Sequence, residues 1–92
     1  MQTIIKKWDD LSKEEVEKIF SLRSEVFIVE QECPYQDVDG RDAKADHLLL
    51  YENNILCAYT RIFPKNTYFK EASFGRTAVK KTHRDKGYGH TL

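Results

Sequence analysis

The sequence predicts an α+β fold with a mostly antiparallel sheet. Near the N-terminus a short strand pattern is followed by a longer segment with helical periodicity, and three further strand patterns then follow one another. One helix and a run of consecutive strands are typical of α+β proteins. The chain has 92 residues, which suffices for one small domain, so we expect residues 1–92 to form a single unit.

The first strand is predicted over residues 3–8, and a helix follows it. Ser12 and Glu15 have the spacing of a capping box, in which each side chain binds the backbone amide of the other residue, and Asp10 is an alternative cap. Apolar residues then recur at helical spacing, with two more beside them. They are Val16, Ile19, Phe20 and Phe27, with Leu22 and Val26.

The end of this helix is ambiguous from the residues alone. The apolar run over residues 26–29 fits a strand as well as a helix. Pro34 disfavours helical backbone at Cys33, so the helix must end by about Glu32. Residues 34–46 contain Pro, Gly and four Asp with few apolar positions, which predicts a loop.

The second half of the chain has the pattern of three strands. Residues 47–52 and 55–63 are strand-like runs separated by Asn53-Asn54. Because Asn tolerates the positive φ that a tight hairpin turn requires, we expect a hairpin here. A second connection leads to a further predicted strand over residues 71–81.

The composition indicates a soluble globular protein in a reducing compartment. The longest apolar run has four residues, 26–29, whereas a membrane-spanning helix needs about 20. At the N-terminus charge follows two isoleucines instead of preceding a long apolar segment, which is not a signal-peptide pattern. Cys33 and Cys57 alone make no disulfide framework. We therefore expect a cytoplasmic protein without a membrane partner.

Charge is unevenly distributed, although 15 acidic and 15 basic residues balance overall. Residues 30–46 contain six acids against two bases, and residues 76–86 contain five bases against one acid. This asymmetry predicts two differently charged surfaces with different partners. The alternative is scattered, solvated charge.

A glycine-bearing turn follows the last predicted strand, over residues 84–90 (Arg-Asp-Lys-Gly-Tyr-Gly-His). Glycines let backbone amides crowd around an anion, and a helix that begins at Tyr88 directs its positive end to the same place. The pattern predicts a pyrophosphate site, with a plain turn as the alternative. Nucleic acid is a weaker alternative, with Phe74 and Tyr88 as stacking platforms, because the bases lie on one short segment of a neutral chain.

Three tracts of the chain resemble the GCN5-related N-acetyltransferases (GNAT). Arg84-x-x-Gly87-x-Gly89 matches the R/Q-x-x-G-x-G/A signature of that family, and residues 72–79 and 22–42 resemble its ElaA-like branch. The resemblance implies the N-terminal part of the GNAT fold. Its parts are a strand, a helix over residues 13–31, a three-stranded antiparallel meander and the start of a pyrophosphate-binding helix. It also implies transfer of an acetyl group from acetyl-CoA to an amine, with no nucleic-acid partner.

The resemblance also assigns the residues that hold acetyl-CoA. Backbone groups of Thr77, Ala78 and Val79 are implied to pair with the pantetheine arm like an added strand. The pyrophosphate is implied to lie on the amides of Arg84, Asp85, Lys86, Gly87, Tyr88 and Gly89. The family usually has glycine where this chain has Asp85, and an acid beside a pyrophosphate is unfavourable unless its side chain turns to solvent.

The acceptor, a small-molecule or peptide amine, arrives mostly protonated and must lose a proton before it attacks. The acids of residues 30–46 are candidates for attracting it, and Glu30 and His47 are candidate proton relays beside Gln31. By period two, Glu71, Ser73, Gly75, Thr77 and Val79 share one strand face. Glu71 and Ser73 are therefore the candidate catalytic residues. The alternatives are structural roles: hydrogen bonding for His47 and binding of loop amides for Glu30 and Gln31.

A metal site is not expected. The Asp37-x-Asp39-Gly40-x-Asp42 tract lacks the spacing and the final Glu of a calcium loop, so we expect Asx turns there. The two cysteines are expected to be packed thiols.

The GNAT pattern continues beyond the motif at which this chain ends. We therefore expect a 92-residue polypeptide to be an incomplete enzyme, weakly stable or self-associating, and poorly active. The unpaired edge of its last strand is the predicted surface for a homo-oligomer. The alternative function is a non-catalytic domain that binds CoA or a partner protein.

Overall fold

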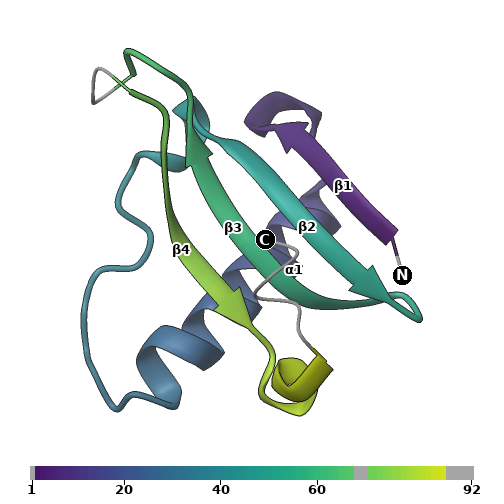
Figure 1. The fold of residues 1–92 in the computed structure, drawn as a ribbon. Coiled ribbons are helices and arrows are strands. Elements are labelled where there is room, and N and C mark those ends of the chain that lie inside the picture. Colours follow the sequence, from purple (N-terminus) through teal and green to yellow (C-terminus); the bar gives the residue numbers. More distant parts are fainter. Residues whose placement is uncertain (1, 68–70, 87–92) are drawn as a thin grey trace.

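The computed structural model describes residues 2–67 and 71–86, in which one helix crosses one face of a four-stranded sheet (Figure 1). In chain order the elements are β1 (Gln2–Lys7), α1 (Lys13–Ser24), β2 (Asp46–Glu52), β3 (Ile55–Phe63) and β4 (Ser73–Val79). Every strand pair is antiparallel, and neighbours in the sheet follow the order β1-β2-β3-β4. The predicted α+β architecture is confirmed.

The helix begins at the predicted capping box. The Ser12 hydroxyl accepts a hydrogen bond from the Glu15 amide at 3.1 Å, and the Ser12 amide donates to the Glu15 carboxylate at 2.8 Å. Lys6 of β1 donates to the same carboxylate at 3.0 Å. The capping box therefore also ties the first strand to the start of α1.

The helical segment continues past α1 into a π-helical turn, η2 (Glu25–Val29). A hydrogen bond of 3.0 Å from the Glu30 amide to the Glu25 carbonyl closes this turn. The ambiguous apolar run is therefore helical, as the resemblance implies, and its Val26 is buried in the core. The chain then turns at Glu32, whose φ is 51°. Turns of this π type are rare and often lie at functional sites.

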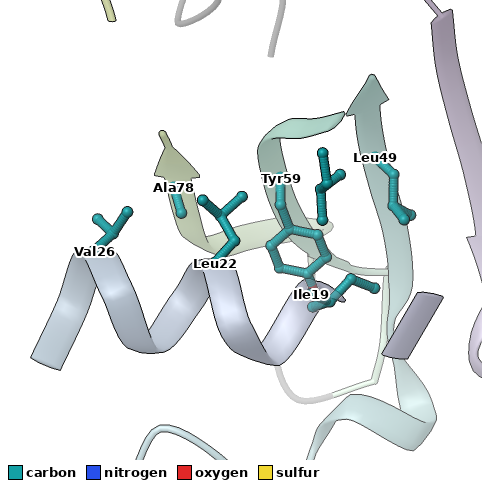
Figure 2. Close-up of a cluster of buried hydrophobic side chains, with 7 residues drawn as sticks. Ile19, Leu22, Val26, Leu49, Tyr59 and Ala78 are labelled. Carbon is teal, nitrogen blue, oxygen red and sulfur yellow. The ribbon is translucent and has the colours of Figure 1, made fainter. Parts of the chain in front are cut away.

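The core lies between α1 and the sheet face that the helix covers. Figure 2 shows Ile19, Leu22 and Val26 of the helical segment facing Leu49, Tyr59 and Ala78 of three strands. Leu56 completes this buried cluster. Burial of each Ile, Leu or Val side chain in this cluster contributes roughly 1.5–3 kcal/mol, so this contact fixes where the helix ends relative to β4.

The predicted hairpin between β2 and β3 is confirmed. Asn53 and Asn54 form its turn with φ values of 53° and 65°. These left-handed conformations suit the two-residue turn that joins right-twisted antiparallel strands.

A bulge interrupts β4 in the middle. Tyr59 of β3 pairs with Ala78, but Arg61 pairs with Gly75, so two residues of β4 lie opposite one residue of β3. Arg76 occupies the bulge with a φ of 52°. The prediction that alternate residues 71–79 share one face is therefore wrong. Before the bulge, Ser73 pairs with Phe63 on the helix-covered face, whereas Thr77 and Val79 lie on the opposite face.

The connections are partly helical. The predicted loop over residues 34–46 contains a short 3-10 turn, η3 (Asp42–Lys44). The segment after β4 forms a second one, η4 (Lys81–Lys86). The last strand is shorter than the predicted residues 71–81, since β4 covers Ser73–Val79. The Lys80 amide still donates to the Cys57 carbonyl of β3 at 2.7 Å, and η4 begins at the next residue.

Candidate cofactor and acceptor site

An open cavity of about 650 Å³ lies between the end of the helical segment and the end of β4. It is lined by Val26, Glu30, Gln31, Thr77, Val79, Lys81 and Arg84. Glu30 and Gln31 are two of the three predicted acceptor residues, and Thr77, Val79 and Arg84 are predicted cofactor residues. The fold thus brings two groups of candidate residues, about 50 positions apart in sequence, to one cavity.

Arg84 joins the two sides of this cavity. Its Nε donates to the Val79 carbonyl at 3.1 Å, and its Nη2 donates to a carboxylate oxygen of Glu30. The side chains of Arg84 and Glu30 are 42% and 23% exposed, so the pair is accessible to solvent. An arginine that lines an open cavity is a suitable anchor for a phosphate group.

The outer edge of β4 pairs with no other strand in residues 2–67 and 71–86. On the inner edge Ala78 and Val79 pair with β3. An unpaired strand edge offers backbone donors and acceptors to an extended ligand. This is the geometry that pairing of Thr77, Ala78 and Val79 with a pantetheine arm requires.

The rest of the predicted pyrophosphate turn is only partly described. Asp85 and Lys86 end η4, and Gly87, Tyr88 and Gly89 lie outside the described residues, as does the predicted helix from Tyr88. Within the described part, the His83 amide donates to the Lys80 carbonyl at 2.8 Å and starts the turn directly after β4.

The basic segment faces the acidic one instead of forming a separate surface. Arg84 pairs with Glu30, Lys80 pairs with Glu25 at 3.5 Å, and Arg76 pairs with carboxylates of the loop before β2. Figure 1 shows this loop running alongside β4. The prediction of two differently charged surfaces is therefore wrong for these residues, because their charges are neutralised within the chain.

The loop carboxylates form what we call the arginine–aspartate network, whose members are Arg23, Arg61, Arg76, Asp37, Asp39 and Asp42. Arg23 donates to Asp37 at 2.9 Å and to Asp42 at 2.8 Å, and its side chain is 0% exposed. Arg61 donates to Asp39 at 2.9 Å and to Asp42 at 3.2 Å. Three positive and three negative groups thereby fix the loop to the helix and to two strands.

Ion pairs with arginines, more than the predicted Asx turns, hold this loop in place. One Asx turn is present, since the Arg41 amide donates to Asp39 at 3.1 Å, but arginines bind most of the carboxylate oxygens. Burial alone raises the pKa of Asp39, yet hydrogen bonds from Arg61 and the Arg41 amide lower it to about 2. Asp39 is therefore ionised, and all three aspartates are already paired with arginines. The charge count suggested that these carboxylates attract an amine, but arginines of the same chain already bind them.

Sequence reasoning missed this network, although one signal pointed to it. Arg61 lies between Tyr59 and Phe63 on the buried side of a strand. A charged residue at such a position requires a buried partner of opposite charge. The tract of three aspartates was the available partner.

His47 lies away from the cavity, in the core. It is 0% exposed. Its Nε2 bonds the Asp42 carbonyl at 2.9 Å and its Nδ1 bonds the Tyr59 hydroxyl at 2.6 Å. Because a carbonyl only accepts, Nε2 carries the proton and Nδ1 accepts from Tyr59. Burial lowers the pKa of His47, which favours this neutral form. The geometry agrees with the structural alternative for His47.

Glu71 and Ser73 also lie apart from the cavity. Ser73 opens β4, whereas Val79 at the cavity ends it, which is about 20 Å along an extended strand. Glu71 is exposed in the preceding connection. The Ser73 hydroxyl oxygen is buried, with no hydrogen-bond partner in the described part of the chain. The structure does not bring these two candidates together with Glu30 and Gln31.

A second cavity of about 670 Å³ lies between α1 and the start of β3, beside Lys80. None of the predicted site residues lines it. Its lining mixes lysines and glutamates with Leu22, Ile55 and Leu56. Within the described ranges, no group of three His, Cys, Asp or Glu side chains is arranged to hold a metal ion. The helices of these ranges include none with the length and apolar character that crossing a bilayer requires.

Comparisons with known proteins show which family the chain belongs to. No family model matches the chain. A UPF0039 protein of Synechocystis is 40% identical over 87 residues, which are 94% of this chain and 56% of that protein. The protein ElaA of Escherichia coli is 37% identical over 93 residues, covering 94% of this chain and 61% of ElaA. The chain therefore spans less than two thirds of the length of these relatives.

Two crystal structures share the fold. An acyl-CoA N-acyltransferase from Pseudomonas aeruginosa has a TM-score of 0.93 and 35% identity, over 99% of this chain and 64% of that one. The structure of Escherichia coli ElaA has a TM-score of 0.91 and 33% identity, over 99% of this chain and 63% of ElaA. The GNAT fold predicted from the sequence is confirmed for its N-terminal part.

Proposed function

This chain belongs to the ElaA-like branch of the GNAT family, and from this premise we propose that the protein transfers an acetyl group from acetyl-CoA to a primary amine. The cavity that joins Glu30 and Gln31 to Thr77, Val79 and Arg84 carries this proposal. It puts candidate groups for both reactants on opposite walls of one space. Fold alone does not fix function, so the argument depends on this site.

The proposed position of acetyl-CoA follows from the edge of β4. The pantetheine arm pairs with the outer edge of Thr77 to Val79, and the pyrophosphate lies beyond the strand end, on the amides of residues 84–89. Arg84 adds a positive charge on the near side. The thioester then lies toward the bulge at Arg76, where the ladder to β3 is interrupted. Bulges re-aim strand groups and recur next to active sites.

The proposed reaction is direct transfer. The acceptor arrives as an ammonium ion and must first give up a proton. The neutral amine nitrogen then attacks the thioester carbonyl carbon, a C–N bond forms, and the C–S bond breaks. The nitrogen loses one further proton and the departing CoA thiolate takes one up, so that an amide and the CoA thiol result. Holding both reactants in one cavity supplies much of the acceleration by orientation. We assign the acceptor side to Glu30 and Gln31, whose segment ends the helical wall of the cavity.

Glu71 and Ser73 remain proposed catalytic residues, Ser73 at the start of the strand that carries the cofactor edge and Glu71 just before it, and Glu71 is the candidate base. Their position before the bulge requires a water path or movement of the acceptor to reach the thioester. A Glu71→Gln variant tests this role, because loss of a base lowers kcat and shifts its pH profile without changing CoA affinity.

The direct test is thiol release from acetyl-CoA in the presence of a panel of primary amines, combined with calorimetry with CoA. We expect amine-dependent thiol release and CoA binding that the Gly87→Glu change abolishes. A Gln36→Glu variant is the matched control, since it adds the same charge at an exposed loop position. CoA binding without thiol release favours the alternative, a non-catalytic CoA-binding or interaction domain. Absence of CoA binding contradicts both the transferase and the CoA-binding alternative, and leaves only the interaction domain.

Self-association through the edge of β4 is a separate proposal. Sedimentation of the protein with and without CoA tests it. If the pantetheine arm and a second copy compete for the same strand edge, CoA shifts the protein toward the monomer.

A further inference from the structure

The contact between Glu30 and Arg84 has a chemical consequence for ligand binding. The two residues are 54 positions apart, and their side chains meet across the 650 Å³ cavity. The Nε of Arg84 donates to the Val79 carbonyl at 3.1 Å, and the Nη2 of Arg84 donates to the Glu30 carboxylate. The group that faces the incoming cofactor is therefore already bound to a carboxylate of the same chain.

A carboxylate and a phosphate present similar oxygen acceptors to a guanidinium. We propose that Glu30 is an internal competitor of the cofactor for Arg84: a CoA phosphate displaces it, and the released carboxylate then binds the ammonium group of the acceptor. This inference rests on the proposed function and deepens it. It assigns Glu30 a changing partner, Arg84 in the free protein and the acceptor amine in the complex with cofactor.

Exposure makes the exchange feasible. Both side chains are partly open to solvent, at 42% for Arg84 and 23% for Glu30, and exposed ion pairs are weak. A diphosphate carries more negative charge than one carboxylate, and Lys81 in the same lining favours the anion. The carboxylate of Glu25, which lines the other cavity, pairs with Lys80 instead. Glu30 is thus the carboxylate that meets the incoming phosphate at Arg84.

The exchange couples the two binding sites. Cofactor binding frees a negative charge beside Gln31, where the acceptor is proposed to lie. By linkage, an amine that binds Glu30 also favours the cofactor, because both states need the Glu30–Arg84 contact to be broken. The coupling therefore makes each of the two ligands bind more tightly when the other is already bound.

Calorimetry with CoA, at low ionic strength and on the full-length protein, tests the competition. We expect Glu30→Gln to bind CoA about fivefold more tightly than wild type, because a neutral side chain competes less well for Arg84. Glu32→Gln is the matched control: it removes the same charge two residues away, outside the cavity lining. We expect it to change the affinity by less than about twofold. Arg84→Gln is expected to weaken binding.

The double variant Glu30→Gln/Arg84→Gln separates competition from simple repulsion of the phosphate. Without Arg84 there is nothing to compete for, so the gain from Glu30→Gln is expected to fall to the level of Glu32→Gln. Equal gains with and without Arg84, or equal gains from the two glutamate changes, overturn the inference. If wild-type protein binds no CoA at all, the proposed function itself fails and the inference falls with it.

Discussion

The arginine–aspartate network and the Arg84–Glu30 pair use the same two chemical groups in different surroundings. In the network Arg23 is 0% exposed, and its two partners Asp37 and Asp42 are nearly as buried. At the cavity, Arg84 and Glu30 are 42% and 23% exposed. A buried pair cannot lose one partner without leaving a costly unpaired charge, whereas an exposed pair exchanges its partner at little cost. Burial thus divides the ion pairs of this protein into fixed and exchangeable ones.

This difference in burial also determines which carboxylate is accessible to an amine acceptor. The loop before β2 uses three aspartates to hold itself against α1, β3 and β4. Glu30, at the end of the helical wall, keeps a contact that a ligand can replace. The net charge of the 30–46 tract is therefore a poor guide to its function, and the burial of each pair is a better one.

The largest expected effect is removal of Arg23. Arg23→Met leaves Asp37 and Asp42 buried without their partner, and we expect it to lower the free energy of unfolding by about 3–5 kcal/mol. Urea denaturation followed by circular dichroism measures it. Lys18→Met, which removes the exposed partner of Glu14, is the control and is expected to leave the urea midpoint nearly unchanged. Equal midpoints for the two variants contradict the division by burial.

A smaller effect is expected at the edge of the network. Asp39 is 22% exposed and accepts from Arg61 at 2.9 and 3.0 Å, so Asp39→Asn is expected to cost about 1–2 kcal/mol. Its pKa of about 2 lies below the unfolded value of about 3.9. The unfolded chain therefore takes up this proton first as the pH falls. The contribution is complete above about pH 4 and lost toward pH 2. A variant with an unchanged acid slope contradicts this assignment.

His47 is expected to add a pH slope in a different window. Burial lowers its pKa from the unfolded value of about 6.5, so the unfolded chain binds the proton more readily. Stability is then complete above about pH 6.5 and declines as the pH falls below it. Denaturation midpoints of wild type and His47→Gln between pH 7 and 5 measure this. The slope is expected to flatten in the variant, and an identical slope rules out His47 as its source.

The smallest effect on stability is expected for Glu30→Gln, the variant with the largest gain in CoA affinity. Because the pair with Arg84 is solvent-exposed, the free energy of unfolding is expected to change by less than about 0.5 kcal/mol. Thermal melts without ligand provide the measurement. If Glu30→Gln lowers the free energy of unfolding as much as Asp39→Asn does, Glu30 is a structural residue, and the contrast between buried and exposed ion pairs is wrong.

Local signals made part of this fold predictable. The Ser12–Glu15 capping box and the Asn53-Asn54 turn depend on residues a few positions apart, and both were correct. The bulge was not predictable, because Arg76 adopts a left-handed φ of 52° that its residue type disfavours. Its long-range contacts with the loop accompany this conformation. Alternation along β4 therefore failed beyond that residue.

The candidate site was likewise predictable only in part. Sequence reasoning named five residues that the structure brings to one cavity, namely Glu30, Gln31, Thr77, Val79 and Arg84. It gave no sign that Glu30 and Arg84 bind each other, because that contact joins positions 54 apart. Nor did the three aspartates indicate their arginines, which lie on separate elements.

Backbone amide NMR shifts during titration with CoA test most directly whether this cavity is the cofactor site. The account predicts shifts concentrated at Thr77 to Arg84 and at Glu30 and Gln31, with the network residues Arg23 and Asp42 unmoved. Shifts confined to the other cavity, around Ser21 and Ile55, contradict it, as does a spectrum that CoA leaves unchanged.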